Sequence, residues 1–146
     1  MFKHVLIGTD GSDLARKAVT TGLTLAKELN ARVTAVTVTP PWDAVAAVAE
    51  LSLPNPVADY DEIVAASANR ILWDVTQMAK KIGIGCSTLH SKEKYPAEGI
   101  LETAKERGCD LIVMASHGRR GISRILLGSQ TTEVLTLSAI PVLICR

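Results

Sequence analysis

The chain has 146 residues, of which 47% are hydrophobic and 21% charged, and its 16 basic and 15 acidic residues leave a formal net charge of +1. This length suffices for one hydrophobic core, so we expect one domain over residues 1–146, and the even charge balance argues against nucleic acid as a partner. No apolar run approaches the roughly 20 residues of a membrane-spanning helix, so we expect no membrane partner. The first residues lack the continuous apolar stretch of a secretory signal, so we expect a cytoplasmic location.

Strand-like and helix-like segments alternate from the start of the chain. An apolar run over residues 2–8 predicts a strand, and Ser12 or Asp13 is the expected N-cap of a helix that extends to Leu29. Residues 33–38, which are largely β-branched, predict a second strand. Residues 40–57 contain four prolines and form an irregular excursion in which we expect one short helix.

The second half of the chain continues this alternation. Helical periodicity predicts the longest helix over residues 57–82, followed by a strand over residues 84–90. Pro96 suits the first turn of the next helix, which Gly108 ends. Residues 111–115 are continuously apolar, which is typical of a strand buried on both faces. A loop over residues 116–128, a helix over residues 129–138 and a strand over residues 142–145 complete the chain.

Five strands that alternate with helices predict an α/β fold. Strands joined through helices run parallel, and the helices cover both faces of the sheet. Ligands of such sheets bind beyond the carboxyl ends of the strands. The turns at residues 8–12 and 116–129 are therefore the candidate ligand-binding segments.

The turn after the fourth strand has the composition of an anion site. Its glycines let backbone N–H groups face a ligand, and the helix start at Ser129 offers unpaired donors and the positive end of a helix dipole. Arginines and hydroxyls nearby add charge and donors. The alternative is an ordinary loop with a serine cap and solvated arginines, but the combination of features favours anion binding.

Asp10 has two interpretations. A carboxylate at the end of the first strand can bind a ribose hydroxyl or Mg²⁺, but Asp also often accepts from nearby backbone in a turn, here from Gly11 or Ser12. The second turn favours the ligand-binding interpretation. No metal site made by protein side chains alone is expected, because Cys86 and His90 have no third ligand nearby.

Several other residues are expected to be structural. We expect the three cysteines to be buried, reduced thiols. We expect Trp42 and Trp73 to be packing residues. Ser116 and His117 are not expected to form a nucleophilic pair, because adjacent side chains rarely face each other.

The chain resembles the universal stress protein family. The segment Met114-Ala115-Ser116-His117-Gly118, nine further residues and Gly128-Ser129 resemble the family's nucleotide-binding signature G-x2-G-x9-G-[ST], with Ala115 in place of the first glycine. Further similar segments are VLIGTDGS at residues 5–12, Pro96-Ala97, CDLIVM at residues 109–114 and IPVLI at residues 140–144. Tyr95 replaces the glycine that usually precedes Pro-Ala.

The resemblance implies a Rossmann-like open sheet with strand order 3-2-1-4-5, of the adenine nucleotide α-hydrolase-like type. It also implies a site for ATP or another adenine nucleotide, with or without Mg²⁺, in which Asp10 lies beside the ribose or the metal. The residues expected around the adenine are Thr9, Val38 and Met114. Those expected around the phosphates are Gly118, Arg119, Gly128, Ser129, Gln130 and Thr131. A homodimer is implied through the last strand, at Val142, Leu143 and Ile144.

Three functions follow as hypotheses. The first is a stress-response protein that binds ATP or a related nucleotide as a regulatory ligand. The second is a dimeric interaction module that binds no nucleotide, because the methyl group of Ala115 could crowd the ligand. The third, an ATP-cleaving enzyme, is disfavoured because the S-G-G-x-D-S loop of ATP pyrophosphatases is absent, so we expect no dedicated enzyme although slow hydrolysis can accompany binding.

Overall fold

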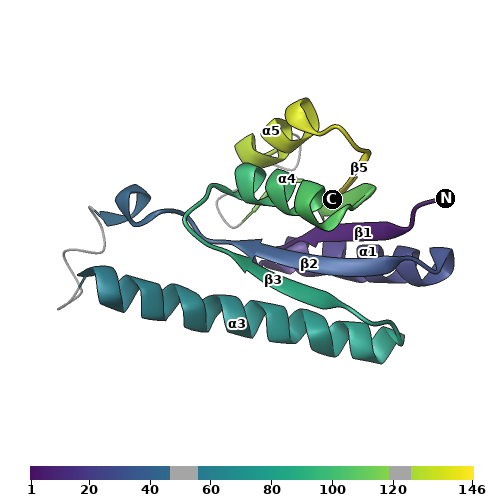
Figure 1. Cartoon of the computed structure of the whole chain (residues 1–146), viewed down its shortest axis with the longest axis horizontal. Coiled ribbons are helices and arrows are strands. Elements are labelled where there is room, and N and C mark those ends of the chain that lie inside the picture. Colours follow the sequence, from purple (N-terminus) through teal and green to yellow (C-terminus); the bar gives the residue numbers. More distant parts are fainter. Residues whose placement is uncertain (47–55, 119–125) are drawn as a thin grey trace.

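The computed structural model describes residues 1–46, 56–118 and 126–146, and it contains a sheet with helices on both faces (Figure 1). Five strands of the described chain lie in the order β3-β2-β1-β4-β5, and every neighbouring pair is parallel. The predicted α/β fold and its 3-2-1-4-5 order are thereby confirmed. The strands are β1 (His4–Gly8), β2 (Arg32–Val38), β3 (Ser87–Ser91), β4 (Leu111–Ala115) and β5 (Val142–Cys145).

The helices divide between the two faces of this sheet. Helices α1 and α3 cover one face, and α4 and α5 cover the other (Figure 1). Their bounds are α1 (Asp13–Leu29), α3 (Pro56–Ile82), α4 (Pro96–Arg107) and α5 (Ser129–Leu137), and a short 3-10 helix, η1, spans Trp42–Ala44.

Alternating side chains along the central strands divide the core between these faces. In β1, Val5 and Ile7 pack against α1 and α3, whereas Leu6 packs against α4 and α5. All three are fully buried, which is why the run is continuously apolar. On the second face α4 approaches the end of β2 closely, because a Cβ added to Gly99 would lie 2.6 Å from Val38 Cγ2.

Two strands begin later than the apolar pattern predicts. β1 begins at His4 rather than at residue 2, and β3 begins at Ser87 rather than at residue 84. The N–H groups of Gly83 and Ile84 both donate to the Ala79 carbonyl, which closes α3 in a turn, and Gly83 has the φ of 84° that glycine adopts readily. Ile84 nevertheless packs against the core, so its apolar character reflects burial rather than strand pairing.

The segments flanking α1 and β2 follow the predictions only in part. Ser12 is the N-cap of α1, and its Oγ accepts from the Ala15 N–H at 3.3 Å. After β2 the excursion begins with η1, and the expected short helix falls largely in residues 47–55, outside the described residues. No helix within the three described ranges is long and apolar enough to cross a bilayer.

The two tryptophans have different surroundings. Trp42 packs edge-on against Tyr60, with ring centroids 5.2 Å apart, as expected of a packing residue. Trp73 on α3 is 64% exposed, so the prediction of a packing role there is wrong. Helical periodicity identifies one buried face of α3, and Trp73 lies outside it.

Candidate functional site

The two turns singled out from the sequence lie side by side, because β1 and β4 are neighbours in the sheet. Both remain tied to adjacent strands just beyond their own ends. The Thr9 N–H donates to the Val36 carbonyl at 3.0 Å, and the Ser116 N–H donates to the Cys145 carbonyl at 2.8 Å. Each turn therefore starts from a fixed point at the carboxyl edge of the sheet.

The turn after β1 is held by two side-chain acceptors. Asp10 Oδ1 accepts from the Ser12 N–H at 3.0 Å, and Thr9 Oγ1 accepts from the Gly11 N–H at 3.2 Å. Gly11 has a φ of 78°, in the left-handed region that favours glycine. Asp10 is thus a turn-forming residue, as its structural interpretation predicts.

The second carboxylate oxygen of Asp10 faces the other turn. A Cβ built on Gly118 would lie only 2.6 Å from Asp10 Oδ2, closer than real Cβ contacts allow. Residues 8–12 and 116–118 therefore converge on one point, and glycine at position 118 is what permits the approach.

The two described ends of the segment between β4 and α5 meet. The Gly128 N–H donates to the Ser116 carbonyl at 2.8 Å, and a Cβ on Gly128 would lie 3.2 Å from His117 Cα. Gly128 is also the N-cap of α5 and has no side chain with which to cap the helix. The first turn of α5 consequently directs backbone N–H groups toward the same edge of the sheet.

Two predicted phosphate-binding residues use their side chains within the protein. Gln130 Oε1 accepts from the Ala97 N–H at 3.0 Å, and Thr131 Oγ1 donates to the Ala115 carbonyl at 3.1 Å. Thr131 is buried, whereas Ser129 at the start of α5 is exposed. The Thr131 hydroxyl proton is thus used within the protein, whereas Gln130 keeps its side-chain Nε2 donors and both residues keep their backbone N–H groups for a ligand. Arg119 lies outside the described residues.

The residues expected around an adenine lie at three neighbouring strand ends. Thr9 follows β1, Val38 ends β2 and Met114 lies near the end of β4. Thr9 and Met114 are buried, and Val38 and Met114 belong to the core cluster beneath α4 and α5. They can form an apolar wall.

Ala115, the departure from the family signature, has its methyl group packed away on the α1 face. It is buried in a small cluster with Ala15 and Ala18. Neighbouring Met114 packs on the opposite face, as alternation along a strand requires.

The serine and histidine of the β4 turn do meet. Ser116 Oγ lies 3.3 Å from His117 Nδ1, because the chain bends at these two residues after leaving β4. The expectation that they would not face each other is wrong. Ser116 is buried, and its hydrogen bond to His117 stabilises the start of the turn.

The residues weighed as metal ligands do not form a cluster. His90 in β3 pairs through Nε2 with Thr39 Oγ1 at 2.9 Å, whereas Cys86 precedes the strand. Among the residues that the structure describes, no group of three or more His, Cys, Asp or Glu side chains is placed to hold a metal ion. All three cysteines are free thiols, as predicted. The prediction that they are buried is confirmed for Cys109, whereas Cys86 and Cys145 are half-buried.

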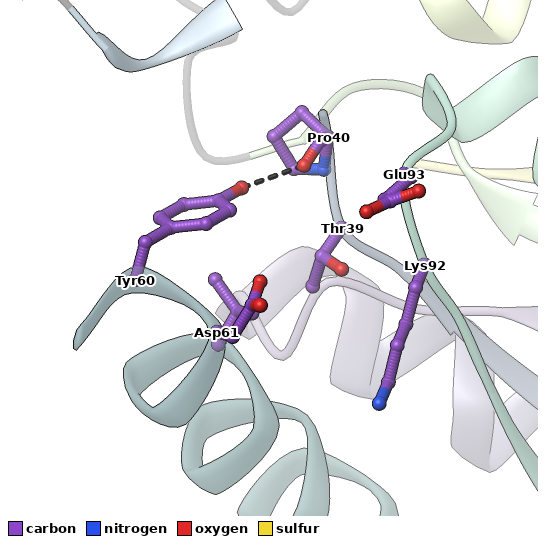
Figure 2. Close-up of a pocket in the computed structure, with 7 residues that line it drawn as sticks. Thr39, Pro40, Tyr60, Asp61, Lys92 and Glu93 are labelled. Carbon is purple, nitrogen blue, oxygen red and sulfur yellow. Dashed lines mark hydrogen bonds between the residues drawn. The ribbon is translucent and has the colours of Figure 1, made fainter. Parts of the chain in front are cut away.

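A cavity of about 120 Å³ lies beside this edge of the sheet, between α3 and the segments after β2 and β3 (Figure 2). Tyr60 closes one side of it by donating from its hydroxyl to the Pro40 carbonyl at 2.6 Å. Asp61, Lys92 and Glu93 supply charges. These residues could not be predicted as a site from the sequence, because they come from separate elements and form no local motif. The volume falls below the roughly 300–1,000 Å³ of small-molecule sites.

Comparison with known proteins identifies the family. A family model described as the universal stress protein family matches residues 1–146. Universal stress protein YxiE of Bacillus subtilis is 35% identical over 151 residues that cover all of both chains. The solved structure of MJ0577 of Methanocaldococcus jannaschii has a TM-score of 0.80 at 26% identity over 99% of this chain and 96% of that one. A universal stress protein in complex with cAMP has a TM-score of 0.71 at 26% identity over 99% and 97% of the two chains. The present chain belongs to the universal stress protein family.

Proposed function

We propose that this chain binds an adenine nucleotide, ATP or a close relative with Mg²⁺, as a regulatory ligand in the stress response. The ligand would lie across the carboxyl ends of β1 and β4. The observation that carries this proposal is the convergence of Gly118 on Asp10, where an added Cβ would come within 2.6 Å of the carboxylate.

The residues of both turns have the chemistry that a nucleotide needs. The Asp10 carboxylate can accept from a ribose hydroxyl or bind a Mg²⁺ ion that a nucleotide brings. Glycine at position 118 lets the Asp10 carboxylate lie directly against the backbone of the second turn, which brings the two proposed halves of the site together. The N-terminus of α5 at Gly128, together with the exposed Ser129, favours phosphate oxygens. We assign Gln130 and Thr131 to the phosphates through their backbone N–H groups, and Arg119 through its charge.

The adenine would lie against Thr9, Val38 and Met114. The cluster that contains Val38 and Met114 is apolar, and an apolar wall with a few polar groups is typical of sites for planar ligands. The cAMP complex of a relative that is 26% identical over nearly the whole chain supports an adenine nucleotide as the class of ligand. We favour a regulatory ligand over a substrate, because the Ser116 and His117 pair is accounted for by its own turn.

The second hypothesis, an interaction module without nucleotide, depends on crowding by Ala115. Its methyl group packs with Ala15 and Ala18, on the face opposite the proposed adenine wall. This packing argues against a steric obstacle from Ala115 and supports the proposal of nucleotide binding.

Isothermal titration tests the proposal directly. We expect heat of binding for at least one of Mg-ATP, AMP and cyclic AMP at protein concentrations near about 100 µM, the weak end of useful affinities. A Gly128→Val variant should lose this heat while it still unfolds cooperatively, because its side chain would press on His117 and block a phosphate. Absence of heat with all three nucleotides would refute the proposal, and a nucleotide retained by the purified protein, seen by mass spectrometry, would support it.

We also propose a homodimer through β5. This strand lies at an end of the sheet order, and Leu143 is 37% exposed between the half-buried Val142 and Ile144. An apolar edge strand is a template for pairing with another chain. Size-exclusion chromatography with light scattering should give about twice the mass of one chain for the wild-type protein. A Leu143→Glu variant should give the mass of a single chain. A monomeric wild-type protein would refute the dimer without bearing on nucleotide binding.

A further inference from the structure

We propose that a groove between α1 and α3 binds a small planar aromatic carboxylate, outside the proposed nucleotide site. The groove has a volume of about 300 Å³ and is lined by Gly11, Arg16, Arg70, Ile71, Trp73 and Asp74. This volume lies at the lower end of the range for small-molecule sites, and no motif in the sequence marks it.

Trp73 supplies an aromatic face. It is 64% exposed and lines the groove, although a large aromatic side chain gains much free energy from leaving water. An indole offers a broad apolar plane on which a second ring can stack. Half-buried Ile71 adds a second apolar surface to the lining of the groove. The groove therefore favours a flat ring.

The charges of the groove leave it positive. Two arginines and one aspartate line it, and Arg16 Nε pairs with Asp74 Oδ2 at 3.3 Å, which links α1 to α3. This pair offsets one guanidinium and leaves the charge of Arg70. The planar fork of arginine matches a carboxylate with two parallel hydrogen bonds.

The spacing along α3 places both features on one side of the helix. Arg70 precedes Trp73 by three residues, so the two side chains are neighbours one turn apart. A ligand ring stacked on the indole would have its carboxylate within reach of the guanidinium. A neutral aromatic molecule would lack the ionic contact, and a saturated acid would lack the stacking contact.

The groove stays open in the proposed assembly. It lies between α1 and α3, and α3 packs over β2 and β3, whereas β5 lies at the other edge of the sheet (Figure 1). A dimer through β5 would leave Trp73 exposed. Gly11 lines the groove and belongs to the same turn as Asp10, so the groove adjoins the proposed nucleotide site. None of the residues that line the groove is assigned to the nucleotide.

The indole N–H resonance of Trp73 in a ¹⁵N-labelled protein provides a direct readout. Trp73→Phe and Trp42→Phe variants assign the two indole signals. We expect 2-naphthoate to shift the Trp73 signal with a dissociation constant on the order of 1 mM or tighter, and 2-naphthamide and cyclohexanecarboxylate to shift it much less. The titration is done without nucleotide, so its outcome is independent of the proposed nucleotide site.

Charge variants separate ionic recognition from stacking alone. Arg70→Gln should weaken 2-naphthoate binding about tenfold or more, whereas Asp74→Asn should strengthen it by removing a negative charge and releasing Arg16. Lys80→Gln removes the same charge farther along α3 and should leave the affinity unchanged. No shift up to about 10 mM 2-naphthoate, an equal response to 2-naphthamide, or equal effects of Arg70→Gln and Lys80→Gln would each overturn the proposal.

Discussion

Substitution of Asp10 separates its two roles, because its two oxygens point to different partners. Oδ1 accepts from the Ser12 N–H at 3.0 Å, whereas Oδ2 faces Gly118. Asp10→Asn keeps a carbonyl oxygen for Ser12 but removes the negative charge. Asp10→Ala removes both. A comparison of the two variants therefore distinguishes the turn from the proposed ligand contact.

The expected magnitudes follow from this geometry. Loss of the hydrogen bond to the half-buried Asp10 carboxylate should cost Asp10→Ala about 1 kcal/mol of unfolding free energy, whereas Asp10→Asn should stay within about 0.5 kcal/mol of wild type. Both should lose about 10- to 100-fold in Mg-ATP affinity, since a charge-assisted contact contributes roughly 1.5–3 kcal/mol. Adenosine should lose less, because it brings no metal ion.

Urea unfolding and isothermal titration measure these two quantities on the same preparations. Asp13→Asn is the matched control, because it removes an exposed carboxylate from the first turn of α1 without touching the proposed ligand. Unchanged Mg-ATP affinity in Asp10→Asn would refute the ligand contact. Equal losses for Mg-ATP and adenosine would exclude a metal contact through Asp10, and an equal loss in Asp13→Asn would indicate general electrostatics.

Three further predictions concern Gly118 in the proposed site and the buried titratable side chains of His4 and Cys109. Gly118→Ala should lower nucleotide affinity by roughly tenfold with an unchanged circular dichroism spectrum, because its methyl group would displace the Asp10 carboxylate; normal affinity would contradict the convergence of the turns. Burial and, secondarily, the charge of Arg32 lower the pKa of His4 below its usual 6.5. His4 therefore takes up a proton more readily in the unfolded chain than in the folded one. The free energy of unfolding should fall as the pH drops below 6.5, and it should fall less in a His4→Gln variant. Burial raises the pKa of Cys109 to about 11 from its usual 9.0, so its alkylation by iodoacetamide at pH 8 should be about 100-fold slower in the native than in the guanidinium-unfolded protein, as followed by mass spectrometry.

The fold could be predicted because its main determinants are local. The period of α1 and the continuous apolar run of β4 each identify an element and the way it is buried. The start of β3 could not be found in this manner. Ile84 and Cys86 pack against the core from the turn before the strand, and burial alone gives them the apolar character that also marks a strand.

The position of the proposed site could be predicted from the sequence, but the role of each side chain within it could not be predicted. Glycines at positions 118 and 128 are visible in the sequence, and the sheet topology brings their segment beside the turn of Asp10. The partners of Gln130 and Thr131 are set by tertiary contacts that no spacing encodes: Gln130 reaches the first turn of α4, and Thr131 reaches the β4 backbone. The exposure of Trp73 is equally invisible, because an indole on a helix usually indicates a core position.

Fixing these side chains within the protein has a consequence for how the proposed site recognises its ligand. In the proposed site, the donors that remain for phosphates at α5 are backbone N–H groups, the exposed hydroxyl of Ser129 and the side-chain Nε2 of Gln130. Backbone donors are held in place by the helix and by the Gly128 to Ser116 hydrogen bond at 2.8 Å, so binding requires little further ordering. Such donors recognise the phosphate that all adenine nucleotides share. In the proposed site, discrimination among ATP, AMP and cyclic AMP would then depend on Asp10 and on a Mg²⁺ ion that the nucleotide brings, and we expect the three nucleotides to bind with similar affinity once Asp10→Asn removes that charge.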